Sequence, residues 1–329
     1  MKKSLQIISC IICFVCYNTV LFNAFAKDVK NINKAENTIK IEDKNTASSN
    51  ENIKKIANTI KHSFAINRNF AKQDFSYNTP NANSILRFSD MKSNGIGGSY
   101  QIKINQNQTF GIDATYSSVM QGFGSDDDIT NKAGTFSVHD IRGSMFDLNT
   151  FAKFNINQYL QYGFGYSFKQ YNLQMYNMYQ FGVDDNFLNP YFKAVTDGTN
   201  FQRTNARMQT VYTSLDFNPN ENTLFYLQLH TGQYRGYNDW QTYQWTLNSK
   251  SNASSFFKPQ NGYGFVAGFK GKFKATSYFD IEYFAKYDSF VFKDLVENDL
   301  GYDGNYILQS NYKSQVLFSR MMMGVGLLF

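Results

Sequence analysis

The feature that most constrains the fold is a period-two alternation of apolar and polar residues, which begins near His62 and continues to Phe329. In "YLQYGFGYSFK", residues 159–169, aromatic and aliphatic side chains take every second position. In "YFDIEYFAKYD", residues 278–288, the intervening polar positions are mostly charged. Successive side chains of a strand point to opposite faces. A soluble sandwich would bury the apolar face against a second sheet, whereas an aromatic face opposite a charged one favours a membrane barrel with a polar lumen.

The connections between these stretches are of two kinds, and together they set the number of strands. Short polar turns are predicted at residues 105–108, 155–158, 218–222 and 274–277. Long polar loops are predicted at about residues 123–141, 176–204, 238–260 and 294–312. The strands between them are predicted at about residues 95–105, 108–122, 142–155, 159–175, 205–217, 223–237, 261–274 and 278–293.

An opening strand between His62 and Asn94 and a closing strand over residues 313–329 bring the total to about ten. The predicted fold class is all-β, a transmembrane antiparallel β-barrel with long extracellular loops and short periplasmic turns. Both termini are then predicted to be periplasmic, and the expected location is the bacterial outer membrane, with the loops at the cell surface.

The N-terminal residues predict export. Lys2 and Lys3 precede an apolar run that ends at a small-residue site, Ala24 to Ala26, so residues 1–26 are predicted to be a signal peptide. A single membrane helix is the competing interpretation, but polar residues interrupt the run. Residues 27–61 are rich in Lys, Asn, Glu and Ser and are predicted to be a flexible polar arm. Residues 62–329 form the predicted barrel.

The amino-acid composition limits the covalent chemistry and the partners that we expect of the exported chain. All three cysteines, Cys10, Cys13 and Cys16, lie in the predicted signal peptide, so the exported chain is expected to have no disulfide and no thiol nucleophile. The chain has 32 Phe and 23 Tyr but only 2 Trp, as an aromatic-rich barrel would. The net charge of +6 is scattered, which favours contact with anionic lipid head groups and predicts no nucleic-acid partner.

Three consecutive aspartates, Asp126 to Asp128, lie in the predicted loop "GFGSDDDITNKAGTF". They have three interpretations: the acidic half of an active site, a metal site, or a solvated loop tip. Carboxylates can collect calcium, but no evenly spaced ligands with the expected glycine follow them. We therefore predict no metal and no cofactor, and keep the catalytic and loop-tip interpretations open.

Several fragments together resemble a known family. The run "SDMKSNGIGGSYQIKINQNQTFGIDATYSS" is followed by "DDDI", "GTF", "FDLNTFAKFNI", "YGFGYSF", "VYTSL", "FKPQNGY" and a closing strand that ends in Phe. In this order, over about residues 84–329, they are similar to the omptin family of outer-membrane proteases. The resemblance implies a ten-stranded barrel with a groove at its extracellular rim. In that groove an Asp-Asp pair faces an Asp-His pair, which activates a water for attack on a peptide carbonyl.

On this resemblance Asp126 and Asp128 take the places of the Asp-Asp pair. The Asp-His half departs from the family pattern, because the segment after "QYRG" reads "YNDWQTYQWTLN". A gapless alignment places Gln244 and Thr246 there, whereas an alignment with a deletion of odd length places Asp239 and Gln241 there. Neither supplies a histidine, and the deletion turns Asp239 to the wrong face unless a bulge compensates.

The three histidines of the chain are His62, His139 and His230. Alternation predicts that His230 is a hydrogen-bonded lumen residue well below the rim. His139 lies in the region of the aspartates, where it is either a substitute base or a solvated loop residue.

The resemblance also implies a lipopolysaccharide contact on the outer wall. Tyr166, Arg207 and Lys258 match positions of that contact, where the cations would pair with lipid A phosphates. Phe168 and Gln170 replace charged partners at two other positions. Lipopolysaccharide is accordingly the one structural or activating lipid that we expect.

The main functional prediction is an omptin-like surface barrel with a degenerate protease site that acts mainly in binding or adhesion. Its predicted partners are outer-membrane lipid and host or peptide surface ligands, and it is expected to be a monomer. One alternative is an active omptin-type endopeptidase that uses Asp126, Asp128 and, on the deletion alignment, Asp239. The other is a narrow channel, which side chains filling a ten-stranded lumen would disfavour.

Overall fold

The computed structural model describes residues 60–79, 84–105, 107–129, 134–183, 190–195, 202–244, 249–300, 307–308 and 313–329. The description is limited to the backbone at residues 79, 84, 126–129, 134–139, 177–183, 190–195, 202, 238–244, 249–259, 294–300, 307–308 and 313. The predicted signal peptide and nearly all of the predicted N-terminal arm lie outside the described residues. No helix in the described ranges is long and apolar enough to cross a membrane.

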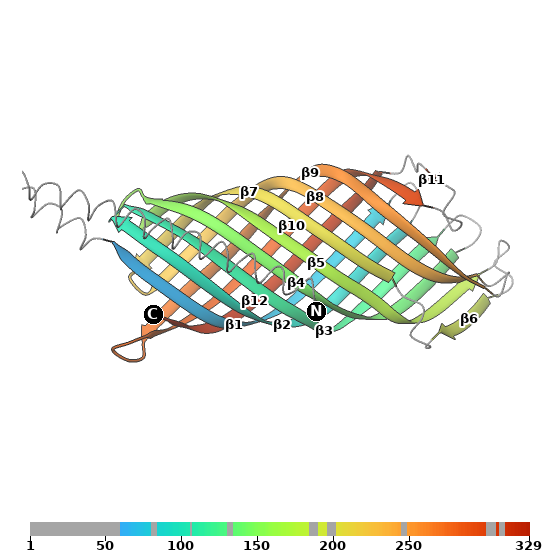
Figure 1. Cartoon of the computed structure of the whole chain (residues 1–329), viewed down its shortest axis with the longest axis horizontal. Helices are drawn as coiled ribbons and strands as arrows, with labels where there is room; N and C mark the ends of the chain where they lie inside the picture. The colour runs from blue at the N-terminus through green and yellow to red at the C-terminus, as the bar shows by residue number, and fades with distance from the viewer. Residues whose placement is uncertain are drawn as a thin grey trace, which may run out of the picture. The chain divides into compact units, whose positions relative to one another are not determined.

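Within these ranges, ten strands form one sheet that closes on itself (Figure 1). They are β1 (Lys61–Thr79), β2 (Ser84–Asn105), β3 (Gln108–Ile129), β4 (Gly134–Asn155), β5 (Leu160–Val183), β7 (Gln202–Asn220), β8 (Thr223–Gln244), β9 (Ser249–Lys274), β10 (Asp280–Leu300) and β12 (Lys313–Leu328). Two short strands, β6 (Pro190–Val195) and β11 (Ile307–Leu308), pair with β5 and β10.

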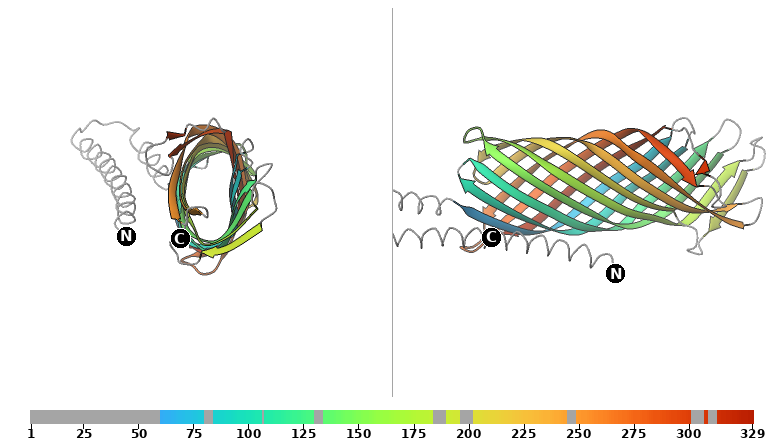
Figure 2. Two further views of the ribbon diagram at one scale, coloured as in Figure 1. Left: turned by 90° about the vertical axis from the view of Figure 1, so that its right-hand side faces the viewer. Right: turned by 45° about the horizontal axis from the view of Figure 1, so that its top comes forward.

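The closure joins the first and last strands. β1 pairs antiparallel with both β2 and β12, and β12 pairs in turn with β10. The backbone N–H of Phe64 donates to the carbonyl of Phe329 at 3.1 Å, and that of Phe329 donates back at 2.8 Å. Figure 2 shows the strands as a closed ring of oval cross-section. The predicted ten-stranded antiparallel barrel is confirmed, and closure leaves the main strands without a free sheet edge.

The four short turns form because polar side chains satisfy the backbone where pairing stops. Asn105 Oδ1 accepts from the Asn107 N–H at 2.8 Å, and Asn220 Oδ1 accepts from the Asn222 N–H at 2.9 Å. Asn157 Oδ1 takes two backbone N–H groups, from Tyr159 and Leu160. Thr276 Oγ1 does the same in the fourth turn. Such Asx and Ser/Thr turns replace the missing strand hydrogen bonds, so the predicted turn positions are confirmed.

An apolar belt surrounds the outer wall on the half of the barrel next to the short turns. On β12 it consists of Met321, Met323, Val325 and Leu327, each 41–54% exposed. On the other strands it includes Phe64, Ile66, Ile96, Tyr116, Tyr162, Phe164, Val211, Leu215, Leu227, Leu229, Phe265 and Tyr283. Aliphatic and aromatic side chains facing outward around a closed barrel form a lipid-facing surface. The alternation predicted for residues 159–169 and 278–288 is therefore confirmed.

Beyond the belt, the wall continues with polar side chains. The strands are 16–26 residues long, whereas about 9–11 residues are enough to cross a bilayer. The exposed outward residues of this distal wall include Lys72, Asp74, Asp90, Lys92, Arg142, Asn172, Arg203, Arg207, Gln209, Gln233, Arg235, Asn261 and Lys293. The barrel thus projects from the membrane on the side opposite the short turns.

The predicted long loops are wrong in extent. Residues 123–129 belong to β3 and residues 134–141 to β4, and strand ends, β6 and β11 take up part of each of the other three predicted loops. Asp126 to Asp128 therefore lie in a strand and not at a loop tip. The opening region holds β1 and a β2 that begins at Ser84. The alternation of apolar and polar residues marks only the strand segments that contact lipid. The strands continue beyond these segments because pairing in a closed barrel satisfies each backbone N–H and C=O, whatever side chains the strand carries.

Candidate functional site

The sequence-predicted acidic pair lies at the distal end of β3. Asp126 pairs in register with Leu86 of β2 and with Ser137 of β4, and Asp128 pairs with Ser84 and Thr135. Because residues alternate faces along a strand, Asp126 and Asp128 share one face of β3. The structure thus places the two aspartates together, at the end of the barrel opposite the short turns. Their side chains lie outside the described part, so the catalytic assignment stays a prediction.

Asp239 lies at the distal end of β8, four strand neighbours from β3 through β4, β5 and β7. Its backbone pairs with Arg203 of β7. The β7–β8 register runs without a shift from Gln202–Trp240 to Phe217–Phe225. Over that range, the compensating bulge that the deletion alignment requires is absent. A bulge lies instead in the β8–β9 pairing, between Tyr234 and Gly236.

The three histidines lie at different levels of the barrel. His62 is exposed near the short-turn end and hydrogen-bonds the Tyr100 hydroxyl at 2.8 Å. His230 is 4% exposed, hydrogen-bonds Thr210 at 2.9 Å and stacks on Tyr212 with ring centroids 4.6 Å apart. The prediction of a hydrogen-bonded lumen histidine is confirmed. His139 pairs with Gly124, two positions from the Asp126–Ser137 pair, and is a diagonal neighbour of Asp126 in backbone register.

A buried ionic cluster crosses the middle of the lumen. Arg320 of β12 forms ion pairs with Asp288 of β10 and, at 2.5 Å, with Asp147 of β4. Lys169 of β5 lies 2.9 Å from Asp288 and 3.8 Å from Asp147. All four side chains are at most 3% exposed. Opposite charges from four strands thus neutralise one another where removal from water would otherwise be very costly.

An aromatic layer closes the lumen on the distal side of this cluster. Phe75 of β1 contacts Tyr171 of β5 and Tyr234 of β8, with ring centroids 6.1 Å and 6.4 Å apart. Phe318 of β12 meets Tyr171 at 5.1 Å and Phe290 of β10 at 6.1 Å. The five side chains are at most 2% exposed. Rings from opposite walls therefore meet in the centre, and a larger apolar core continues around them.

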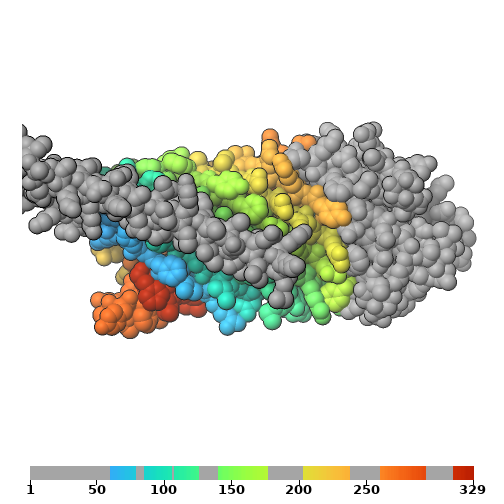
Figure 3. All heavy atoms as spheres, viewed as in Figure 1, coloured from blue at the N-terminus to red at the C-terminus, as the bar shows by residue number. Residues whose placement is uncertain are grey.

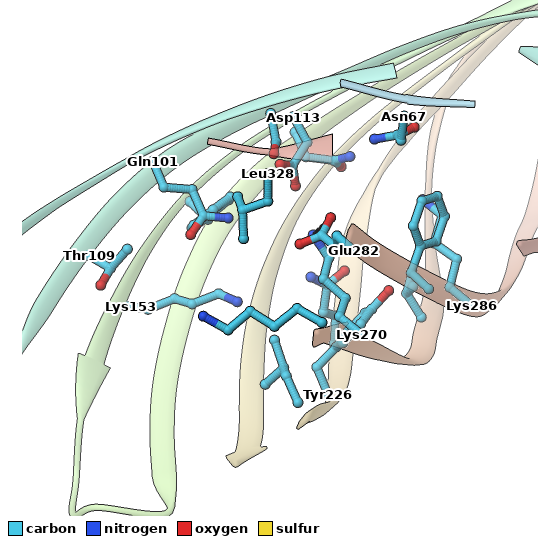
Figure 4. A pocket seen from close by; sticks show the side chains of 18 of the residues that line it. Asn67, Gln101, Thr109, Asp113, Lys153, Tyr226, Lys270, Glu282, Lys286 and Leu328 are labelled. Carbon is cyan, nitrogen blue, oxygen red and sulfur yellow. Dashed lines mark ion pairs between the residues drawn. The ribbon is translucent and has the colours of Figure 1, made fainter. Parts of the chain in front are cut away.

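A polar cavity of about 380 Å³ occupies the lumen on the short-turn side of the ionic cluster. Figure 4 shows Lys153 of β4, Lys270 of β9 and Glu282 of β10 extending into it. Lys153 pairs with Asp216 at 2.5 Å, and Lys270 lies 3.9 Å from Glu282. Asp113 Oδ1 is buried without a hydrogen-bond partner among the described residues. A cavity of this polarity suits water, and the ionic and aromatic layers separate it from the distal end.

The lipid contact implied by the resemblance stays a prediction, but the structure shows where its residues lie on the wall. Tyr166 and Arg207 point outward from β5 and β7 and are exposed. The backbone of Lys258 lies at the β8–β9 bulge, facing the stretch around Arg235. Arg235, which the sequence argument missed, pairs directly with Arg207 and is also exposed. Alternation along "QYRGY" indicates its outward face, but only the strand register reveals that two arginines stand side by side.

Among the described residues, no group of three or more His, Cys, Asp or Glu side chains is arranged to hold a metal ion. The two carboxylates of the ionic cluster, Asp147 and Asp288, already pair with Arg320 and Lys169.

Comparison with known proteins identifies the fold. The outer-membrane protease OmpT of Escherichia coli superposes with a TM-score of 0.64 at 10% identity, over 82% of this chain and 96% of that one. The translocator domain of the autotransporter NalP of Neisseria meningitidis (TM-score 0.36, 10% identity, 85% and 95% coverage) and the attachment protein Ail of Yersinia pestis (TM-score 0.27, 11% identity, 82% and 99% coverage) match more loosely. Neither a protein-family model nor a curated protein sequence matches this chain.

The OmpT likeness shows a shared fold and, at this identity, carries neither activity nor family membership. The closed wall, the outward apolar belt and the charged interior agree with it. The chain is therefore a bacterial outer-membrane β-barrel protein with a ten-stranded wall and a lumen closed by side chains.

Proposed function

We propose that this barrel is a cell-surface binding protein that carries a degenerate omptin-like rim. The observation that carries the proposal is the position of the histidines. His230 lies in the lumen, where its ring contacts Phe290 of the aromatic layer at 5.2 Å, and His62 lies near the short-turn end. Neither can reach a substrate at the distal rim. A peptidase would then depend on His139 or on a carboxylate, whose low ordinary pKa makes it a poor base near pH 7.

The closed interior supports a surface role over a pore. Arg320 and the aromatic ring of Tyr171 occupy the centre of the lumen, both at most 1% exposed. Conduction would need these layers to separate, which breaks buried ion pairs. The part of the barrel that meets partners is then the distal wall and rim, which project beyond the apolar belt.

A second candidate is an omptin-type endopeptidase, and one observation favours it. Asp126 and His139 are diagonal neighbours in the β3–β4 register, and such positions lie within reach of long side chains. A base supplied by the neighbouring strand would differ from the family arrangement, in which the acidic pair and the Asp-His pair face each other across a groove.

Outer-leaflet lipid is the partner supported on the wall of β7 and β8. Arg207 and Arg235 are cross-strand neighbours, and like charges placed directly opposite destabilise a sheet. Neither makes an ion pair with another described residue. Lipid phosphates next to the belt would neutralise both, in the way the resemblance implies for the cations Arg207 and Lys258.

The experiment measures binding of cells that display the protein to host cells and to surfaces coated with matrix proteins. The test variant is Asp126→Ala/Asp128→Ala, and the matched control is Asp127→Ala, which removes an adjacent aspartate of the opposite parity. We expect binding above that of barrel-free cells, retained within about twofold in both variants. Binding no higher than that of barrel-free cells would refute the proposal. Loss in the double variant alone would show that the acidic pair is itself the functional site.

A further inference from the structure

Two lysines lie directly opposite each other at the short-turn end of the barrel. Lys61 begins β1, which Figure 3 shows (blue) beside β12 (red) at this end. Lys61 pairs in register with Lys103 of β2. Lys103 pairs in turn with Thr109 of β3, and Thr109 pairs with Lys153 of β4. Thr109 and Lys153 line the polar cavity, and directly paired residues share one face of a sheet. Both lysines of the pair therefore face the lumen.

Neither lysine of this pair is neutralised by a described neighbour. Both are exposed, and their side chains form no ion pair or hydrogen bond with another described residue. The acidic groups near this end are engaged or lie elsewhere. Asp216 pairs with Lys153 at 2.5 Å, and Asp280 lies 4.0 Å from Lys272. Glu221 lies in the β7–β8 turn, at least four strand neighbours from β1 and β2. The carboxyl oxygen of the last residue accepts a backbone N–H of β1 at 3.1 Å.

The lysine pair stands at the entrance of the polar cavity of about 380 Å³. Ser63 of β1 and Gln101 of β2, one lumen row further in, line the cavity and pair with each other in register. Figure 4 shows Gln101 and Thr109 in its wall. The exposed turn residues Glu221 and Asn222 also line it, so the cavity reaches the water at the short-turn end. A small molecule can therefore enter from the short-turn side and pass the lysines.

Deeper in the cavity, the polar groups suit a molecule with several hydroxyl groups. Asp113 of β3 forms no ion pair or hydrogen bond with another described residue, and its Oδ1 is buried. Lys270, on which the charge of Asp113 acts, lies 3.9 Å from Glu282. Many of the other lining residues are Ser, Thr, Asn or Gln. Carboxylates accept hydrogen bonds from hydroxyl groups, an ammonium donates to them, and hydroxyl and amide side chains do both. This mixture of donors and acceptors matches a sugar.

The spacing along β3 limits the size of the molecule. Thr109, the register partner of Lys103, and Asp113 lie on the same face of β3, four residues apart. At about 3.3 Å per residue, they are separated by about 13 Å. A free phosphate is too short to contact both ends. A monosaccharide that carries one phosphate group spans this distance when a hydrogen bond at each end is included.

We propose that this lumen site binds a phosphorylated monosaccharide that enters from the short-turn side. Its phosphate lies between Lys61 and Lys103, and its ring hydroxyls lie at Asp113, Glu282 and Lys270. A phosphate monoester is close to a dianion at neutral pH, so it matches the two lysines in charge and relieves their repulsion. A neutral sugar would leave the lysines without a counter-charge, and inorganic phosphate would leave Asp113 without a donor. The site is separate from the distal rim and from the lipid contact on β7 and β8, so it does not rest on the function proposed above.

The test uses the refolded full-length barrel in neutral detergent and measures the Kd for glucose-6-phosphate by isothermal titration calorimetry. The first variant is Lys61→Gln/Lys103→Gln, which replaces two exposed side chains and disturbs no observed contact, so the barrel should stay folded. The second is Asp113→Asn, which keeps the size of the side chain. The matched control, Lys92→Gln/Lys293→Gln, removes two exposed lysines of the distal outer wall. Glucose and inorganic phosphate are titrated separately.

We expect saturable binding to the unmodified protein, about tenfold weaker binding to the double lysine variant, and a smaller loss with Asp113→Asn. The control should stay within about twofold of the unmodified protein. Glucose and inorganic phosphate should each bind at least about tenfold more weakly than glucose-6-phosphate. The inference is overturned if the unmodified protein shows no saturable binding, if either variant binds like the control, or if glucose or inorganic phosphate binds as tightly as glucose-6-phosphate.

Discussion

Charges inside this barrel and charges on its distal outer wall are arranged in opposite ways. In the lumen, Arg320 and Lys169 each contact both Asp147 and Asp288, with side chains at most 3% exposed. On the wall, Arg207 stands directly opposite Arg235, and neither forms an ion pair with another described residue. Removing one partner of a buried ion pair costs about 3–5 kcal/mol, whereas exposed like charges placed opposite each other destabilise a sheet by only about 0.2–1 kcal/mol. The interior charges of this cluster therefore serve stability, whereas the arginines of the wall remain available for the lipid contact proposed above.

The largest expected effect comes from removing one carboxylate of the buried ionic cluster. Asp288→Ala leaves Arg320 and Lys169 with one shared carboxylate, and we expect it to lower the free energy of unfolding by about 3–5 kcal/mol. The control is Asp280→Ala on the same strand, whose carboxylate lies 4.0 Å from a half-exposed Lys272. It should cost at most about 1 kcal/mol. Urea unfolding of the refolded barrel in detergent measures both, and equal losses would contradict the comparison.

The aromatic layer gives the second prediction. With the rings of Phe75, Tyr171 and Phe318 meeting across the lumen, the protein in a planar bilayer is expected to pass no steady ionic current. Replacing the three rings with alanine removes the contacts that join opposite walls, and current steps should then be more frequent. Regular current steps of one size from the unmodified protein would show that the interior opens and would favour the channel interpretation over the surface-binding one.

The smallest expected effect concerns the outer wall. In lipid-free detergent, Arg207→Gln/Arg235→Gln removes a like-charge pair and should leave the free energy of unfolding unchanged or raise it by about 0.2–1 kcal/mol. In the presence of lipopolysaccharide the same change should weaken lipid binding about tenfold. A loss of stability without lipid would mean that the two arginines have a structural role, which would remove the contrast between the interior and the wall.

Most of the wall could be predicted from the sequence, because alternation and short polar turns are local. The outward faces of β5, β10 and β12 follow from every second residue, as with Tyr162, Tyr283 and Met323. The distal strand ends could not be predicted, because their sequences are polar and their pairing depends on the backbone of the neighbouring strand. "SDDDI" reads as a loop by composition and lies in β3 by register.

The candidate sites depend on contacts between strands that are distant in sequence. Asp147, Lys169, Asp288 and Arg320 lie on four strands, and alternation indicates that each faces inward but not that they meet. The pairs Arg207–Arg235 and Lys61–Lys103 likewise emerge only from register. The lumen position of His230 was predicted correctly, because the face on which it lies and its distance from the rim both follow from the neighbouring residues of its own strand. The assignments of Asp126, Asp128 and Asp239 depend on the family resemblance and stay predictions.

The central claim is that function lies in binding at the surface and that the rim does not cleave peptides efficiently. The most direct measurement is the cleavage rate of a peptide with adjacent basic residues by the protein refolded with lipopolysaccharide. Without a positioned imidazole, the rate should be about 10²–10⁴-fold below that of an omptin peptidase under the same conditions. A comparable rate that Asp126→Ala and His139→Ala abolish, and that His230→Gln leaves intact, would contradict the account and establish a peptidase whose base comes from β4.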